Sequence, residues 1–142
     1  MKYNNPILLI EDDIIDAMTV KRALKELKVS NPVIRVENGE KAIAYLKDKN
    51  NVRPTIILLD LNMPKMNGLE FLKIIKADPR FNFIPVIVLT TSGDEKDKIE
   101  TFKHSIAGYM IKPVDYNQFV ETIRTIERYW TLSELPIKED GV

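Results

Sequence analysis

The fold is decided by the stretch Thr55-Ile56-Ile57-Leu58-Leu59-Asp60-Leu61-Asn62-Met63-Pro64. Its first five residues form an apolar run rich in β-branched side chains, which is typical of a strand buried inside a parallel sheet. Asp60 follows directly, so this strand would deliver a carboxylate to the edge where open α/β sheets bind ligands. The alternative for Asp60 alone is an aspartate that only caps the next loop.

Apolar runs alternate with helical patterns on both sides of this stretch. Further strands are predicted at 7–10, 33–36, 85–89 and 108–111, and helices at 13–28, 40–50, 68–76, after 92 and from 116 to about 132. Five strand–helix units predict an α/β fold with a parallel sheet covered by helices on both faces. Ser92 and Glu95 match the Ser-x-x-Glu capping box at the start of the fourth helix. We expect one domain over residues 5–132 and a mobile tail over residues 133–142.

Composition narrows the function classes. The 142 residues suit one domain with its own core, and the absence of cysteine excludes thiol redox chemistry and cysteine-based zinc sites. The 21 basic and 21 acidic residues cancel, which argues against non-specific binding to nucleic acid or to anionic membranes. The first residues do not form a signal peptide, and no apolar run is long enough to span a bilayer. We expect a cytoplasmic protein.

Four predicted strands end in chemically matched residues: Glu11-Asp12-Asp13, Asp60, Thr90-Thr91-Ser92 and Lys112-Pro113. Because the carboxyl ends of parallel strands share one edge, carboxylates, a hydroxyl and an ammonium group should converge there. Clustered carboxylates repel one another unless a cation intervenes, and Mg²⁺ suits oxygen ligands of this kind. Such a site is suited to phosphoryl transfer with Asp60 as nucleophile, while Lys112 and the metal neutralise charge and Thr90 donates a hydrogen bond.

These residues also have purely structural interpretations. The acidic triplet can serve as the negative N-terminus of a helix, which fits Asp13 better than Asp12. Thr90 alone can cap its strand, and Lys112 alone can be a surface lysine. Joined to Pro113, Lys112 is more informative, because a cis peptide bond there would fix the lysine side chain. Four unrelated accidents at four strand ends are improbable, so we favour a functional site.

The chain resembles response-regulator receiver domains from about Pro6 to Trp130. The resemblance is carried by Ile10-Glu11-Asp12, by Asp60-Leu61-Asn62-Met63-Pro64 with Gly68, by Leu89-Thr90-Thr91-Ser92 and by Tyr109-Met110-Ile111-Lys112-Pro113. It implies a flavodoxin-like (βα)5 fold, a doubly wound five-stranded parallel sheet of strand order 2-1-3-4-5, and a role in two-component signal transduction. Details near the C-terminus resemble single-domain regulators paired with phytochrome-type or hybrid histidine kinases.

The resemblance also implies a role for each site residue. Asp60 would accept a phosphoryl group from the phosphohistidine of a sensor histidine kinase, and Lys112 would pair with Asp60 and then with its phosphate. Asp12 and Asp60 would bind Mg²⁺ directly, Glu11 would act through water, and the backbone carbonyl of Asn62 would be a further ligand. The protein would catalyse its own phosphorylation and dephosphorylation without being a turnover enzyme.

The implied output is a change in shape. Thr90 and Tyr109 would be the switch residues, and the side chains of Asn62 and Ser92 would tune dephosphorylation. The signalling surface would consist of the fourth helix, the fifth strand and the last helix. It would include Lys103, His104, Tyr116 and Arg124, and it would bind a downstream protein or a second copy of the chain. Neither nucleic acid nor a membrane is expected as a partner.

Three other functions are weighed against this one. Hydrolases of the aspartyl-phosphate type need a second aspartate two residues after the nucleophile, where this chain has Asn62. A flavin-binding protein of the same fold is disfavoured because the acidic cluster would repel the flavin phosphate and no phosphate-binding loop follows the first strand. A receiver that works without phosphate is disfavoured by the intact set Asp12, Asp60, Thr90 and Lys112.

Overall fold

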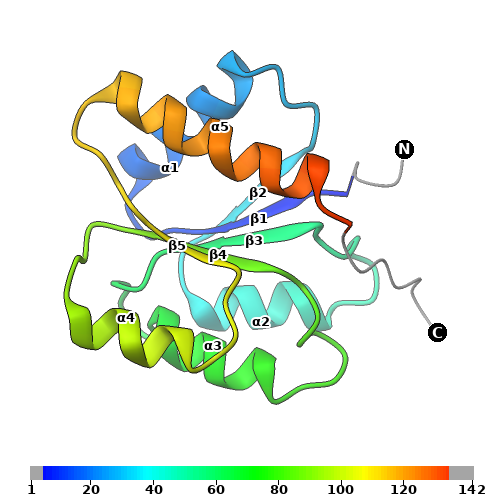
Figure 1. Ribbon diagram of the computed structural model, residues 1–142. Helices are drawn as coiled ribbons and strands as arrows, with labels where there is room; N and C mark the ends of the chain where they lie inside the picture. The colour runs from blue at the N-terminus through cyan, green and yellow to red at the C-terminus, as the bar shows by residue number, and fades with distance from the viewer. Residues whose placement is uncertain (1–4, 135–142) are drawn as a thin grey trace.

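The computed structural model describes residues 5–134 of the chain (Figure 1). The elements are β1 (Ile7–Ile10), α1 (Ile14–Glu26), β2 (Val33–Val36), α2 (Gly39–Lys47), β3 (Ile56–Leu59), α3 (Gly68–Lys76), β4 (Val86–Thr90), α4 (Glu95–Phe102), β5 (Gly108–Ile111) and α5 (Tyr116–Leu132). Every strand and helix predicted from the sequence is present.

The five strands form one parallel sheet in the order β2-β1-β3-β4-β5, which confirms the flavodoxin-like fold. Helices α1 and α5 cover one face of the sheet, and α2, α3 and α4 cover the other (Figure 1). The three central strands β1, β3 and β4 are buried along their whole length, because helices lie on both sides of them. Continuous apolar runs are what such a position requires.

The sheet separates two hydrophobic clusters. Trp130 of α5 packs with Ile7 in the cluster beneath α1 and α5, and Phe71 of α3 packs with Leu59 in the cluster on the other face. Full burial of an apolar side chain of this size stabilises the fold by about 1.5–3 kcal/mol. The central strands are therefore held firmly, and so are the residues that follow them.

Helix starts are set by capping side chains. Asp13 caps α1, where its carboxylate accepts hydrogen bonds from the backbone N–H groups of Ile15 and Asp16. The capping box predicted at Ser92 is wrong, because α4 is capped two residues later by Asp94. The Ser92 hydroxyl instead donates a hydrogen bond of 2.7 Å to the carboxylate of Asp97.

The start of α3 packs directly on the loop after β3. A Cβ atom at Gly68 would lie 2.6 Å from the carbonyl oxygen of Asp60 and 2.8 Å from Cα of Leu61, both of them backbone atoms. The N–H of Gly68 also donates a hydrogen bond of 3.1 Å to the carbonyl of Leu61. Only glycine allows this approach, which fixes the backbone next to Asp60.

The predicted tail begins where α5 ends, because Ser133 is the C-cap of that helix. The rest of the predicted tail, from residue 135 onward, lies outside the described residues. None of the helices within residues 5–134 is long and apolar enough to cross a bilayer.

Candidate functional site

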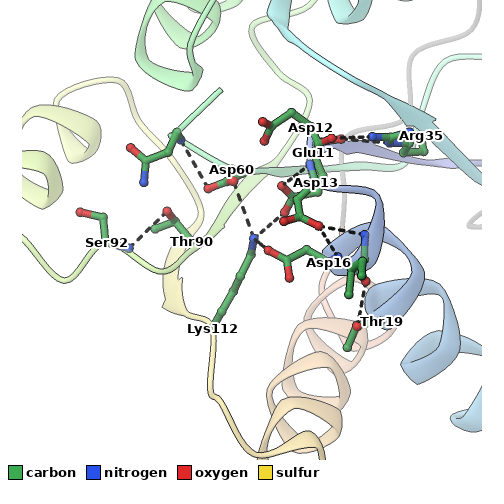
Figure 2. A network of polar contacts seen from close by, with 12 residues as sticks. Glu11, Asp12, Asp13, Asp16, Thr19, Arg35, Asp60, Thr90, Ser92 and Lys112 are labelled. Carbon is green, nitrogen blue, oxygen red and sulfur yellow. Dashed lines mark hydrogen bonds and ion pairs between the residues drawn. The ribbon is translucent and has the colours of Figure 1, made fainter. Parts of the chain in front are cut away.

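Residues at the carboxyl ends of β1, β3, β4 and β5, or directly after them, meet at one edge of the sheet, as predicted (Figure 2). The sheet's hydrogen bonding continues past the strand ends. The N–H of Asp60 donates to the carbonyl of Ile10 at 3.0 Å, and the N–H of Lys112 donates to the carbonyl of Thr90 at 2.8 Å. Asp60 is thereby held beside the acidic segment that begins at Glu11, and Lys112 beside Thr90.

Three carboxylates form a cluster that could hold a metal ion. Glu11, Asp12 and Asp60 each offer an oxygen, and these oxygens all lie within 4.8 Å of one another. Glu11 and Asp60 are buried and Asp12 is exposed, so an ion bound here would be reached from the Asp12 side. A donor set made only of carboxylate oxygens suits hard divalent ions such as Mg²⁺ and Mn²⁺. These residues therefore fit the predicted ion.

Lys112 is the cation that the cluster already contains. Its ammonium Nζ lies 2.5 Å from Oε1 of Glu11, 3.0 Å from Oδ2 of Asp16 and 3.7 Å from Oδ2 of Asp60, and its side chain is only 7% exposed (Figure 2). The predicted pairing of Lys112 with Asp60 is present, but Glu11 and Asp16 hold the lysine more closely.

Asp16 is a site residue that the sequence analysis missed. It lies in the first turn of α1, where an acidic residue is also favoured by the helix dipole, so it was not distinguishable from an ordinary N-terminal residue. Its sequence position carries no signal of the contact with Lys112, which lies 96 residues further along the chain.

Burial shapes the electrostatics of the cluster. It raises the pKa of the Glu11 carboxyl from 4.5 to about 7, although the hydrogen bond from Lys112 acts in the opposite direction, and the charge of Asp60 adds to the rise. Burial lowers the pKa of Lys112, but its hydrogen bond to Glu11 and the negative charge of Asp60 outweigh this and raise it above 10.5. Lys112 therefore stays charged, and Glu11 loses its charge more easily than an ordinary glutamate does.

The two predicted switch residues are both connected to Ser92. The backbone N–H of Ser92 donates to the hydroxyl of the fully buried Thr90 at 3.4 Å, and its carbonyl accepts a hydrogen bond of 2.8 Å from the hydroxyl of Tyr109. The half-buried Tyr109 ring also stacks on Phe102 of α4, with 6.4 Å between the centroids. One loop thus links the carboxyl edge of the sheet to α4.

Two predictions about single residues are wrong. No peptide bond within residues 5–134 is cis, so the bond between Lys112 and Pro113 is trans. The lysine is fixed instead by its backbone hydrogen bond to Thr90 and by its ion pairs. Tyr116 does not face the signalling surface. Its ring packs against α1, where the guanidinium carbon of Arg22 lies 4.1 Å from the ring centroid.

Comparison with known proteins agrees with this geometry. The family model described as the response regulator receiver domain matches residues 7–124. The response regulator Rcp1 of Synechocystis sp. is 37% identical over 128 residues, which cover 87% of each chain. The structure of the phosphorylated cyanobacterial phytochrome response regulator RcpA superimposes with a TM-score of 0.88 at 36% identity, covering 95% of this chain and 99% of that one. The Mn²⁺-bound form of Rcp1 gives a TM-score of 0.85 at 36% identity, covering 92% and 98%. The chain therefore belongs to the response-regulator receiver domain family and acts in two-component signal transduction.

Proposed function

We propose that this protein is a Mg²⁺-dependent phosphoacceptor that takes a phosphoryl group from the phosphohistidine of a histidine kinase onto Asp60. The observation that carries this proposal is the placement of one buried carboxylate, Asp60, beside the ammonium group of Lys112 and two further carboxylates. The similarity to phytochrome response regulators favours a phytochrome-type kinase as the donor.

The chain's own residues supply most of the chemistry. A carboxylate oxygen of Asp60 attacks phosphorus, the bond to the donor nitrogen breaks, and the nitrogen leaves with the bonding pair and takes up a proton. In the product, an acyl phosphate, a phosphoryl group with a charge of about −1.5 to −2 replaces the single negative charge of the Asp60 carboxylate at a buried edge. Lys112 is placed to neutralise this charge, and the buried hydroxyl of Thr90 to donate a hydrogen bond to a phosphoryl oxygen.

A divalent ion would be held directly by Asp12 and Asp60, by Glu11 through water and by the backbone carbonyl of Asn62. The bound ion supplies positive charge that offsets the charge developing on the phosphoryl oxygens. The oxygen-only donor set supports Mg²⁺, and the existence of a Mn²⁺-bound form of Rcp1 supports a divalent ion of this class.

Phosphorylation would be read on the surface formed by α4, β5 and α5. The shared contacts of Thr90 and Tyr109 with Ser92 support a connection between the acyl phosphate and α4. Exposed apolar side chains on α4 and β5 support binding of a downstream protein or of a second copy: Ile99, Phe102 and Ile111. The side chains of Asn62 and Ser92 would adjust how fast the phosphate is lost.

Acetyl phosphate and Mg²⁺ provide the direct test. Intact mass spectrometry should detect one acid-labile phosphoryl group on the parent protein and on a Glu121→Gln control, which removes a surface charge of α5. Asp60→Asn should take none, and removal of divalent ions with EDTA should abolish the reaction. A phosphoryl group on the Asp60→Asn protein would overturn the proposal. Sustained hydrolysis of ordinary phosphomonoesters would indicate a turnover phosphatase instead.

A further inference from the structure

The ammonium group of Lys112 has three N–H donors, and its neighbours share them unequally. The contacts to Glu11 and Asp16, at 2.5 and 3.0 Å, are within hydrogen-bonding distance, whereas the 3.7 Å to Asp60 is an ion pair without a hydrogen bond. In Figure 2 the carboxylate of Asp16 reaches from α1 to the lysine nitrogen. The site thus holds its lysine more tightly through a residue of α1 than through the phosphoacceptor.

We propose that Asp16 is a positioning residue that holds Lys112 back from Asp60 in the unphosphorylated state, and that phosphorylation has to break the contact between Asp16 and Lys112. This inference rests on the proposed function, because it assumes that Lys112 moves to the phosphoryl group. The acyl phosphate and Asp16 then compete for the same ammonium group.

Burial determines which partner Lys112 releases. The side chain of Glu11 is 2% exposed, so loss of the lysine would leave a buried carboxylate without a counter-charge or water. The side chain of Asp16 is 42% exposed, so water can replace the ammonium group at little cost. Asp16 is therefore the partner that gives way when a stronger anion forms on Asp60.

A contact that exists only before phosphorylation slows phosphorylation and leaves the decay of the acyl phosphate unchanged. Ion pairs with one partly exposed member change an equilibrium by about 1.5- to 5-fold. Replacing Asp16 by asparagine should therefore raise the rate of phosphorylation by about that factor. Asp16→Glu keeps the charge and should restore a rate close to that of the parent.

The kinetic test uses acetyl phosphate at saturating Mg²⁺, so that differences in metal affinity do not matter. Intact mass gives the initial rate of phosphorylation, and the decay is followed after the donor is removed. Glu26→Gln is the matched control, because it removes one negative charge from the other end of α1. A faster Asp16→Asn protein with unchanged decay and rescue by glutamate would support the proposal. Equal or slower phosphorylation, or an altered decay alone, would overturn it.

A second measurement needs neither metal nor phosphate. A double-mutant cycle of Asp16→Asn and Lys112→Met, read by urea unfolding in EDTA, isolates the contact between the two residues. The unfolding constants should deviate from additivity by about 1.5- to 5-fold in the stabilising direction. Strict additivity would show that the contact does not hold Lys112. If the parent protein takes no phosphoryl group on Asp60, the proposed function fails, whatever the cycle shows.

Discussion

The Nζ atom of Lys112 lies 2.5 Å from Oε1 of Glu11, although the two residues follow the last and the first strand in the chain. Both side chains are almost fully buried. The parallel sheet brings them together because β1 and β5 both end at its carboxyl edge. One lysine thus supplies the counter-charge for carboxylates that would otherwise repel one another.

Replacing Lys112 by methionine should destabilise the metal-free protein by about 3–5 kcal/mol, because buried carboxylates lose their counter-charge. Urea unfolding in EDTA measures this loss. The same variant should bind Mg²⁺ at least as tightly as the parent, because the ion no longer competes with a fixed cation, but it should not signal on phosphorylation. Calorimetric titration with Mg²⁺ tests the first point, and target binding or self-association of the phosphorylated protein tests the second.

The control for this variant is Lys21→Met, which removes an exposed lysine from α1. Its unfolding free energy should stay within about 0.5 kcal/mol of the parent. If both lysine variants are equally stable, the ion pair with Glu11 does not contribute as the geometry indicates. Normal signalling by phosphorylated Lys112→Met protein would show that the switching role of Lys112 is wrong.

The stability of the metal-free protein should fall as the pH rises from about 4.5 to about 7. The pKa of Glu11 is raised from 4.5 to about 7 by burial, so in this range the folded state binds more protons than the unfolded state. Across this pH range the free energy of unfolding should fall by up to roughly 3 kcal/mol. Asp78, whose pKa is lowered to about 2 by hydrogen bonds from Arg80, affects stability only at lower pH, where its contribution is lost on acidification.

Urea unfolding in EDTA across this pH range gives the measurement. Glu11→Gln should remove most of the slope, since its side chain does not titrate. If stability instead increases between these pH values, or if the glutamine variant keeps the parent's slope, another group dominates the pH dependence.

Gly68→Ala should disturb the loop that carries Asp60. The new Cβ would lie 2.6 Å from the carbonyl oxygen of Asp60. Because this neighbour is a backbone atom, relieving the clash would require the loop after β3 or the start of α3 to shift. We expect a loss of about 1–3 kcal/mol from such overpacking, reduced by up to about 1 kcal/mol because alanine is the better helix former. Gly93→Ala is the control, because its nearest neighbour would be Cδ1 of Ile111 at 4.0 Å. Equal unfolding free energies for the two variants would contradict this account.

The parts of the fold that the sequence predicted are those that depend on local pattern. Continuous apolar runs identify β1, β3 and β4, because a central strand of a parallel sheet is buried on both faces. Asp60 and Lys112 each follow a strand, and parallel strands share one carboxyl edge. Their common location could therefore be predicted before any contact between them was known. The strand order came from the family resemblance, since pattern alone does not order parallel strands.

The errors and omissions concern side chains whose role depends on which neighbour they meet. Ser92 lies in a sequence that matches a helix cap, but the carboxylate of Asp97 is close enough to accept a hydrogen bond from its hydroxyl. Asp16 has the sequence of an ordinary first-turn acid, and only the position of the first turn of α1 at the carboxyl edge of the sheet brings it to Lys112. Tyr116 was assigned to the wrong surface because helical spacing does not tell which neighbouring helix covers a given side.

Arg35 lies in β2 and has no role predicted from the sequence, yet its side chain supports the backbone of the acidic cluster. Its Nε donates to the carbonyl of Glu11 and its Nη2 to the carbonyl of Asp12, each at 2.9 Å (Figure 2). The guanidinium group thereby fixes the backbone of two residues whose side chains lie in the carboxylate cluster. Arginine holds two acceptors at once in a way that lysine does not.

Arg35→Met should therefore weaken the binding of Mg²⁺ several-fold, and Arg35→Lys should restore little of it, since one ammonium group does not reproduce the paired geometry. Each hydrogen bond to a charged group contributes about 1.5–3 kcal/mol. Titration calorimetry would detect the share of this free energy that contributes to the affinity for Mg²⁺. Arg124→Met is the matched control, because that arginine pairs with Glu121 on the surface of α5 and lies outside the cluster. The prediction fails if all three variants bind the ion like the parent, because the backbone of Glu11 and Asp12 would then keep its position without the guanidinium group.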